Sequence, residues 1–191
     1  RENGILLVDD EVQAGMGRTG RMWAIEHFGV VPDVVCTSKA LGSGLPIGAA
    51  IFPSHMDLVP GAHSNTFGGN LLACASALAT LDVLETERLL ENAARVGSYL
   101  HQRLFELQQH HETIGDVRGL GLMQAIELVR DRRTKEHAVR ERDVIIEKCF
   151  KRGLILLPAG RSAIRFIPPL IVENDFIDEA MDILDHAFRG P

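Results

Sequence analysis

Two unbroken apolar runs near the start of the chain predict buried parallel strands. Residues 5–8 (Ile-Leu-Leu-Val) lead into Asp10, and residues 34–37 (Val-Val-Cys-Thr) lead into Lys39. Strands that are apolar on both faces are typical of a sheet covered by helices on each side. A short helix predicted at residues 21–28 would join them as a βαβ unit. Because ligands bind at the carboxyl ends of strands in an open α/β sheet, we expect Asp10 and Lys39 at the ligand-binding rim.

The hydrophobic pattern changes over the next fifty residues. A glycine-rich turn at residues 40–46 precedes an apolar segment, residues 47–52, which we expect to return as an antiparallel strand. Residues 71–84 predict a helix that is apolar on nearly all sides, and such a helix should be buried. The composition becomes charged at residues 85–88. We place a domain boundary there, which makes residues 1–87 part of a large α/β domain.

The remainder of the chain alternates between helical and strand patterns. Apolar residues recur at helical spacing from residue 89 to residue 107. The further predicted elements are strands at residues 123–129, 154–157 and 163–167 and helices at residues 134–152 and 173–188. The pattern therefore indicates a small α+β domain over residues 88–191.

Composition narrows the possible partners and surroundings of the chain. A net charge of -6 argues against a general nucleic-acid surface. The longest uncharged stretch, residues 40–56, contains glycines and prolines and cannot span a membrane. The three cysteines are typical of reduced core residues, which indicates the cytoplasm. Because the chain opens almost directly onto a predicted buried strand, we expect it to be the C-terminal part of a longer protein.

A glycine-rich motif offers one interpretation of function. Residues 15–20 match G-x-G-x-x-G, which can hold a dinucleotide pyrophosphate at a helix N-terminus. In that fold the first glycine follows the strand directly, whereas here residues 9–14 intervene and place acids where phosphates would lie. Lys39 also stands where a ribose-binding acid is expected. A surface turn is favoured, and a nicotinamide-dependent oxidoreductase is kept as an alternative.

Asp10, Gln13 and Lys39 make better chemical sense together. A lysine in a pocket that favours its neutral form can make a Schiff base with an aldehyde. A carboxylate facing it across the rim can keep a pyridinium nitrogen protonated. Those are the two protein groups that pyridoxal phosphate requires. Either residue alone would be interpreted as a solvated loop charge, and the strand-end placement of both favours the cofactor.

Several motifs in order resemble one family. They are Asp10-Glu11-Val12-Gln13 with Gly17-Arg18-Thr19-Gly20, Ser38-Lys39 with Gly42-x-Gly44-x-Pro46, Thr66-Phe67-Gly68-Gly69-Asn70, and Arg165-Phe166-Ile167-Pro168-Pro169-Leu170. Together they resemble the class III aminotransferases, pyridoxal-phosphate enzymes of fold type I. The resemblance covers almost the whole chain but only about the second half of a family member. An inactive structural fragment is therefore a second alternative.

The resemblance implies a role for each matching residue of the first domain. Lys39 would bond to the cofactor and move a proton, and Asp10 would pair with the pyridine nitrogen. Asp9 is the competing acid, but neighbouring residues on a strand point to opposite sides, and the register of the motif selects Asp10. Val12 would pack on the ring and Gln13 would bind its phenolic oxygen. The hydroxyl of Thr66 would bind the cofactor phosphate across a dimer interface, which implies a homodimer.

The same resemblance indicates the substrates. The fork of Arg165 could hold a carboxylate bidentately, although a strand-end arginine in solvent is a serious rival interpretation. We expect transamination between an amine and a 2-oxo acid, with 4-aminobutyrate and 2-oxoglutarate as the favoured pair. Ornithine or acetylornithine transamination and amino-acid racemisation are alternatives within the family. The histidines have no ligand spacing with cysteines or acids, so we expect no metal.

Overall fold

The computed structural model describes residues 3–56 and 58–189. Within it, contacts divide the chain into a first unit of residues 1–91 and a second unit of residues 92–191. No helix in these described ranges is long and apolar enough to cross a membrane.

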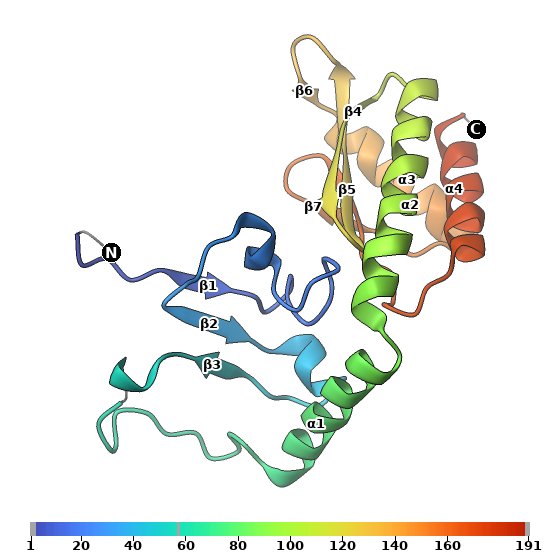
Figure 1. Ribbon diagram of the computed structural model, residues 1–191. Helices are drawn as coiled ribbons and strands as arrows, with labels where there is room; N and C mark the ends of the chain where they lie inside the picture. The colour runs from blue at the N-terminus through green and yellow to red at the C-terminus, as the bar shows by residue number, and fades with distance from the viewer. Residues whose placement is uncertain (1–2, 57, 190–191) are drawn as a thin grey trace. The chain divides into compact units, whose positions relative to one another are not determined.

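The first unit contains a three-stranded sheet in the order β1 (Val8–Asp10), β2 (Val34–Thr37) and β3 (Ala49–Ile51). β1 pairs with β2 in parallel, and β2 pairs with β3 antiparallel, as Figure 1 shows. The predicted parallel pair and its antiparallel return strand are therefore confirmed. The connection between β1 and β2 contains a 3-10 helix, η1 (Ala24–Phe28), and not the longer helix that we expected at residues 21–28.

The predicted burial of this unit is wrong within the described chain. Ile5 is 72% exposed and Val8 is 57% exposed, although both lie in the apolar run that predicted a buried strand. The apolar helix formed as α1 (Leu71–Thr86), but Leu71 is 88% exposed and Leu78 is 69% exposed. α1 packs mainly on the short 3-10 helix η2 (Lys39–Gly42). Apolar residues on all sides indicate that a segment can be buried, but they do not supply the layers that bury it.

The second unit is an α+β arrangement. Its elements are α2 (Leu89–His110, which begins just before the unit), β4 (Ile114–Leu120), β5 (Met123–Asp131), β6 (Glu136–His137), α3 (Val139–Lys151), β7 (Leu157–Ala159), β8 (Ala163–Phe166) and α4 (Asn174–Phe188). The sheet order is β4-β5-β8-β7, all antiparallel, with β6 paired to β5. β4 and β6 were not predicted, and β7 lies three residues later than expected.

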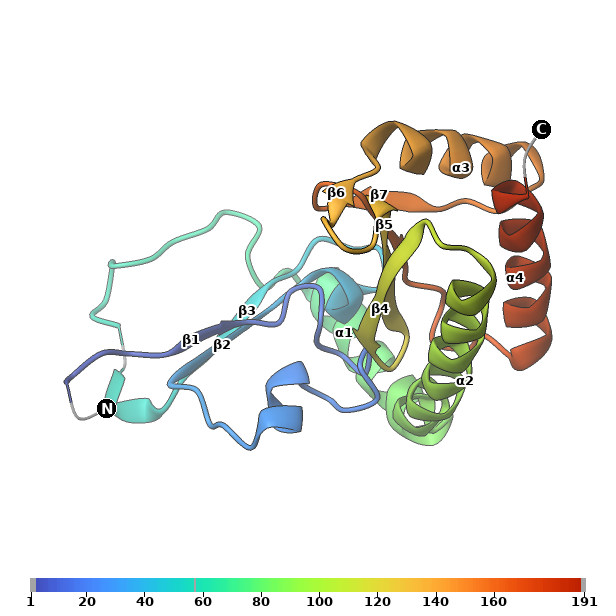
Figure 2. The ribbon, with the colours of Figure 1, turned by 90° about the horizontal axis from the view of Figure 1, so that it is seen from above.

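The helices of the second unit cover one face of this sheet (Figure 2). Leu100 and Leu104 of α2, Ile126 of β5 and Leu184 of α4 are 0 to 1% exposed and belong to one apolar core. The close approach of α2 to the β4–β5 turn depends on a missing side chain. A Cβ atom on Gly97 would lie 2.2 Å from the carbonyl carbon of Gly121. The helices of this unit do not cover the opposite face of the sheet.

Candidate active site

Asp10 and Lys39 lie at the same edge of the three-stranded sheet. Asp10 is paired with Cys36 across the parallel strands, and Lys39 follows Cys36 by three residues. The backbone N–H of Glu11 donates to the carbonyl oxygen of Cys36 at 2.9 Å, which extends the pairing to the end of β1. Both Asp10 and Lys39 are exposed. The structure thus brings these two predicted site residues to one rim.

The carboxylate of Asp10 is oriented by its own loop. The backbone N–H of Val12 donates to Oδ1 of Asp10 at 3.1 Å. Such a local bond fixes the side chain at the strand end and leaves Oδ2 facing away from that contact. An exposed, oriented carboxylate is the group that could accept a hydrogen bond from a protonated ring nitrogen.

Lys39 begins the short 3-10 helix η2, and hydrogen bonds of neighbouring residues hold this helix in place. The hydroxyl of Ser38 donates to the carbonyl oxygen of Ile47 at 2.6 Å. On the other side, the hydroxyl of Ser76 in α1 donates to the carbonyl oxygen of Gly42 at 2.8 Å. Lys39 itself has φ 39°, a left-handed conformation that disfavours residues with a side chain. Backbone strain of this kind persists where surrounding contacts enforce it, and it is common at functional sites.

The amine of Lys39 makes no hydrogen bond or ion pair with any described residue. Its position on a rim loop, and not in the packed core, leaves the amine available to bond to an aldehyde. Such a bond needs the neutral form of the amine, which a covering ligand or further protein would favour by removing water.

The segment after Asp10 forms a turn and does not open an α-helix. A Cβ atom on Gly15 would lie 2.8 Å from the carbonyl oxygen of Glu11 and 2.9 Å from a ring carbon of Trp23, so only glycine fits this position. The next helical element is the five-residue η1, which begins at Ala24. The strand–glycine–helix geometry that a dinucleotide needs is therefore missing from residues 9–28. Val12 is half-buried and Gln13 is exposed beside the rim.

Thr66 lies in a structured turn immediately before α1. Within this turn, the side-chain oxygen of Asn65 accepts the backbone N–H of Phe67 at 3.1 Å. Asn70 then caps the helix, because its side-chain oxygen accepts the backbone N–H of Ala73 at 2.9 Å. The exposed hydroxyl of Thr66 therefore stands near the N-terminus of a 16-residue helix, where the helix dipole favours an anion such as a phosphate.

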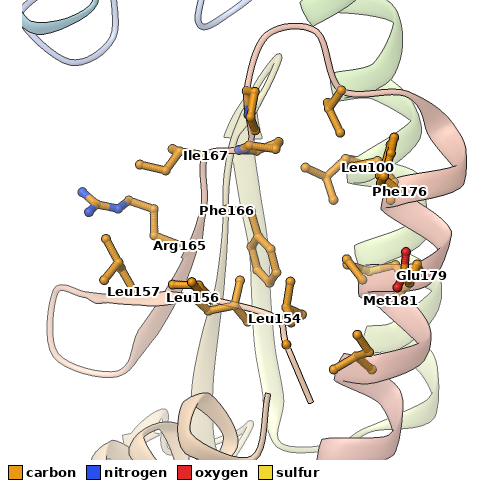
Figure 3. A pocket seen from close by; sticks show the side chains of 18 of the residues that line it. Leu100, Leu154, Leu156, Leu157, Arg165, Phe166, Ile167, Phe176, Glu179 and Met181 are labelled. Atoms are coloured by element: carbon orange, nitrogen blue, oxygen red, sulfur yellow. The ribbon is translucent and has the colours of Figure 1, made fainter. Parts of the chain in front are cut away.

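Arg165 belongs to the second unit, on β8. It is paired with Leu157 of β7 on one side and with Ala125 of β5 on the other. Its side chain points away from that of Phe166, as Figure 3 shows, and so lies on the sheet face that the helices do not cover. Nε of Arg165 is buried and has no hydrogen-bond partner among the described residues.

Arg118 lies in the same cross-strand row, because it too is paired with Ala125. Its guanidinium donates to Asp116 at 2.8 Å and to Glu127 at 2.6 Å. The hydrogen bonds to Glu127 and Asp116 raise the pKa of Arg118, so its guanidinium stays charged and is occupied by these two carboxylates. Of the two arginines in this row, Arg165 is the one without a described carboxylate partner. It is therefore the better candidate for binding a substrate carboxylate.

Arg165 also borders the pocket drawn in Figure 3, which has a volume of about 780 Å³. The lining is mostly apolar, and its charged residues are Arg165 and Glu179. Labelled residues such as Leu154, Phe166 and Met181 offer no group that could transfer a proton. Glu179 supplies a carboxylate that could transfer a proton, so the pocket of the second unit combines an apolar wall with one cation and one acid.

The family model described as Aminotransferase class-III matches residues 1–188 of this chain. The chain belongs to the class III aminotransferases. This membership confirms the family resemblance and the expected α/β fold of pyridoxal-phosphate transferases. It also explains the order of the motifs from Asp10 to Arg165.

Relatives within the class III aminotransferases have different activities. The chain is 44% identical to a leucine/methionine racemase of Thermococcus litoralis over 97% of its length and 42% of that protein. It is 43% identical to an acetylornithine aminotransferase of Clostridium acetobutylicum, over 98% of the chain and 47% of that protein. A probable 4-aminobutyrate aminotransferase of Bacillus subtilis is 40% identical over 100% of the chain and 44% of that protein.

A solved structure of a Bacillus anthracis aminotransferase superposes with a TM-score of 0.92 and 33% sequence identity. The match covers 98% of this chain and 45% of that one. This chain thus spans less than half the length of the relatives named here. The structural match shows the fold of this chain.

The residues of the rim fit the cofactor of this family. Pyridoxal phosphate needs an amine for its aldehyde, a carboxylate for its ring nitrogen and donors for its phosphate. Lys39 and Asp10 offer the first two at one sheet edge, and the turn containing Thr66 offers a hydroxyl near a helix N-terminus. In the described residues no group of three or more histidine, cysteine or acidic side chains could hold a metal ion.

One pair of acids at the rim has no role in the sequence-based assignment. Asp9 and Glu11 flank Asp10, and because side chains alternate along a strand, both lie on the side opposite Asp10. Glu11 is only 2% exposed, which is unusual for a carboxylate. The spacing of two acids around a third could have been noticed in the sequence, but their burial could not.

Proposed function

We propose that the protein containing this chain transfers an amino group between an amine and a 2-oxo acid, using pyridoxal phosphate held at the rim of the three-stranded sheet. The observation behind this proposal is that Asp10 ends β1 and Lys39 follows β2 by two residues, at the carboxyl ends of two strands that pair in parallel. The amine and the acid therefore stand at one edge, as a single ring bound between them would require. Family membership supports this use of the two groups.

Pyridoxal phosphate, when bound, supplies an electron sink for the carbanion that forms when the substrate loses a proton. Lys39 would hold the cofactor through its amine, which can form a Schiff base with an aldehyde with loss of water. Its Nζ would also be the group that accepts and returns the substrate proton. The carboxylate of Asp10 keeps the ring nitrogen protonated.

The remaining rim residues hold and orient the ring. Val12, half-buried after the strand, would pack on the ring face, and Gln13 would bind the phenolic oxygen. The hydroxyl of Thr66 and the N-terminus of α1 would receive the phosphate. By the family resemblance Thr66 serves the neighbouring subunit of a homodimer. The proposed domains are residues 1–87 for the cofactor and residues 88–191 for the small domain, and the proposed location is the cytoplasm.

Arg165 would bind the substrate carboxylate. Its Nε has no described partner, and its position on the uncovered sheet face keeps it clear of the core. The favoured substrates are 4-aminobutyrate and 2-oxoglutarate, in line with the probable 4-aminobutyrate aminotransferase relative. Transamination of ornithine or acetylornithine is the nearest alternative. Racemisation of an amino acid is a second candidate because the relative from Thermococcus litoralis is a racemase.

The decisive experiment maps the lysine that bonds to the cofactor. Full-length protein is given pyridoxal phosphate, reduced with borohydride and digested, and the modified peptide is identified by mass spectrometry. We expect the label on Lys39 and its loss in Lys39→Ala. Label on another lysine would overturn the assignment. The 191-residue chain is treated in parallel, and if it stays colourless while the full-length protein colours, this segment alone is an inactive fragment.

Arg165→Lys tests the carboxylate clamp. A lysine keeps the charge but loses the bidentate fork, so we expect the KM for the 2-oxo acid to rise about tenfold, equivalent to about 1.4 kcal/mol. Arg118→Lys is the matched control, since it lies in the same row but is already occupied by Asp116 and Glu127. Equal effects of the two substitutions would show that Arg165 has no special role.

A further inference from the structure

On the side of β1 opposite Asp10 lie two carboxyl groups whose buried oxygens do not all receive a hydrogen bond from a described residue. Glu11 is 2% exposed, and its Oε1 accepts the backbone N–H of Ile25 at 2.8 Å. The other oxygen, Oε2, is buried without a hydrogen-bond partner among the described residues, and so is Oδ2 of Asp9. If both carboxyls were ionised, each would have a buried oxygen without a hydrogen-bond donor, on the same side of the strand. That arrangement is unfavourable in free energy.

A proton between the two groups removes this difficulty. An ionised carboxylate only accepts hydrogen bonds, whereas a protonated one has an O–H to donate. The side chains of Asp9 and Glu11 lie within hydrogen-bonding reach of each other. Because Glu11 already receives the N–H of Ile25, it is the better acceptor. The proton therefore belongs on Asp9, with its O–H donated to Glu11.

We propose that Asp9 and Glu11 share one proton in the folded protein, and that its loss adds a second negative charge directly behind Asp10. The inference deepens the proposed function and rests on it only for the consequence at Asp10. Asp9 and Glu11 are positioning residues, since they act on the cofactor through Asp10. An added negative charge beside Asp10 would strengthen its hold on a protonated ring nitrogen.

The surroundings of the pair fix the pH at which this happens. Burial, the hydrogen bond to Glu11 and the negative charges of Glu11 and Asp10 together raise the pKa of Asp9 to about 6, and burial has the largest effect. The charged groups that act on Asp9 are the acids Glu11 and Asp10. From η1, the backbone N–H of Ile25 donates to Glu11. The proton is therefore held below about pH 6 and lost above it.

This proton links stability to pH in a defined direction. The pKa of Asp9 is about 6 in the folded protein against an ordinary value of 3.8, so the folded state binds more protons between these values. The stability that the proton contributes is complete below pH 3.8 and declines as the pH rises through about 6. Most paired aspartates have the opposite dependence.

The test uses apo full-length protein and Asp9→Asn. Infrared difference spectra should show one protonated carboxylic acid that titrates near pH 6, and Asp9→Asn should abolish that band. Glu11→Gln, which removes the neighbouring charge, should move the titration to lower pH. Asp82→Asn, an exposed aspartate on α1, is the matched control and should leave the band unchanged. A band that is absent from the wild-type protein, or that survives in Asp9→Asn, would overturn the shared proton.

The consequence at Asp10 is measured separately on the loaded enzyme. The acid limb of the pH profile of kcat/KM should lose its inflection near pH 6 in Asp9→Asn. If the infrared band disappears but the acid limb is unchanged, the action on Asp10 is wrong. Failure of the Lys39 labelling would instead overturn the proposed function, and the infrared titration of the apo protein would be unaffected by it.

Discussion

The two units of this chain bury their apolar residues very differently. In the second unit, Leu104 and Leu184 are 0% exposed within a single core that includes helices and sheet. In the first unit, Leu78 is 69% exposed and Leu71 is 88% exposed, although α1 is at least as apolar as α2. The difference lies in the number of packed layers and not in hydrophobic content.

The candidate catalytic groups lie mostly in the first unit, where fewer apolar residues are buried. Asp10, Lys39 and Thr66 all lie in the loosely packed first unit, whereas the compact second unit contributes Arg165 alone. Stability from packing and chemistry at the rim are thus separable along the chain. Substitutions that lower stability should therefore divide from those that change catalysis according to the unit in which they lie.

The largest contrast in stability is expected between two leucines. Leu104→Ala removes a fully buried side chain and should lower the free energy of unfolding by about 2–5 kcal/mol. Leu78→Ala, the matched substitution on exposed α1, should change it by about 0.5 kcal/mol or less. Urea denaturation followed by circular dichroism measures both. Similar losses for the two variants would refute the difference in burial between the units.

A smaller contrast is expected in how the stability contributed by two aspartates depends on pH. Burial disfavours the charge of Asp185, but hydrogen bonds from His111 and Arg189 outweigh it and lower its pKa below 3.8. Because the folded pKa is lowered, the stability from Asp185 is present above pH 3.8 and is lost as the pH falls, by about 1 kcal/mol at most. Asp9 has the opposite dependence.

Unfolding measured from acid to neutral pH separates the two effects. Asp185→Asn should flatten the acid side of the stability profile, and Asp9→Asn should flatten the decline toward neutral pH. The double variant should show both changes, since the two residues lie in different units. Profiles that change in the same direction for both variants would contradict the assignments.

The smallest contrast between the two units is expected in the rate at which a reagent labels their cysteines. Cys149, in the core of the second unit, is 0% exposed, and burial raises the pKa of its thiol to about 11. Cys36 and Cys74 of the first unit are half-buried. A maleimide reagent should therefore modify these two in the folded protein and reach Cys149 only after unfolding. Mass spectrometry of each peptide over time measures the order, and early labelling of Cys149 would show that the core opens.

Much of the fold could be predicted because local pattern and final structure agree. The run Val34–Thr37 formed β2 with the predicted boundaries, and the periodic apolar face near the C-terminus formed α4. β4 was missed because its sequence, Ile-Gly-Asp-Val-Arg-Gly-Leu, alternates imperfectly and contains two glycines. β7 was placed too early because Pro158 argues against a strand, yet an edge strand tolerates proline.

The candidate site could be predicted in part for the same reason. The strand-end positions of Asp10 and Lys39 follow from two short patterns, and parallel pairing places both at one edge. The pairing of half-buried Asp9 with buried Glu11 depends on which loop covers the strand, and no local pattern in the sequence indicates this. Likewise, Arg118 has carboxylate partners and Arg165 has none described, because the sheet places Asp116 and Glu127 beside Arg118. The sequence near either arginine does not indicate this.

The backbone at Lys39 has a consequence for engineering this protein. The left-handed conformation at φ 39° is one that glycine adopts freely and lysine does not. A selection for thermal tolerance alone would therefore favour Lys39→Gly, which relaxes the main chain and discards the reactive amine. Thermal stability and turnover therefore favour different residues at this position. Mutant libraries screened for thermal stability should keep Lys39.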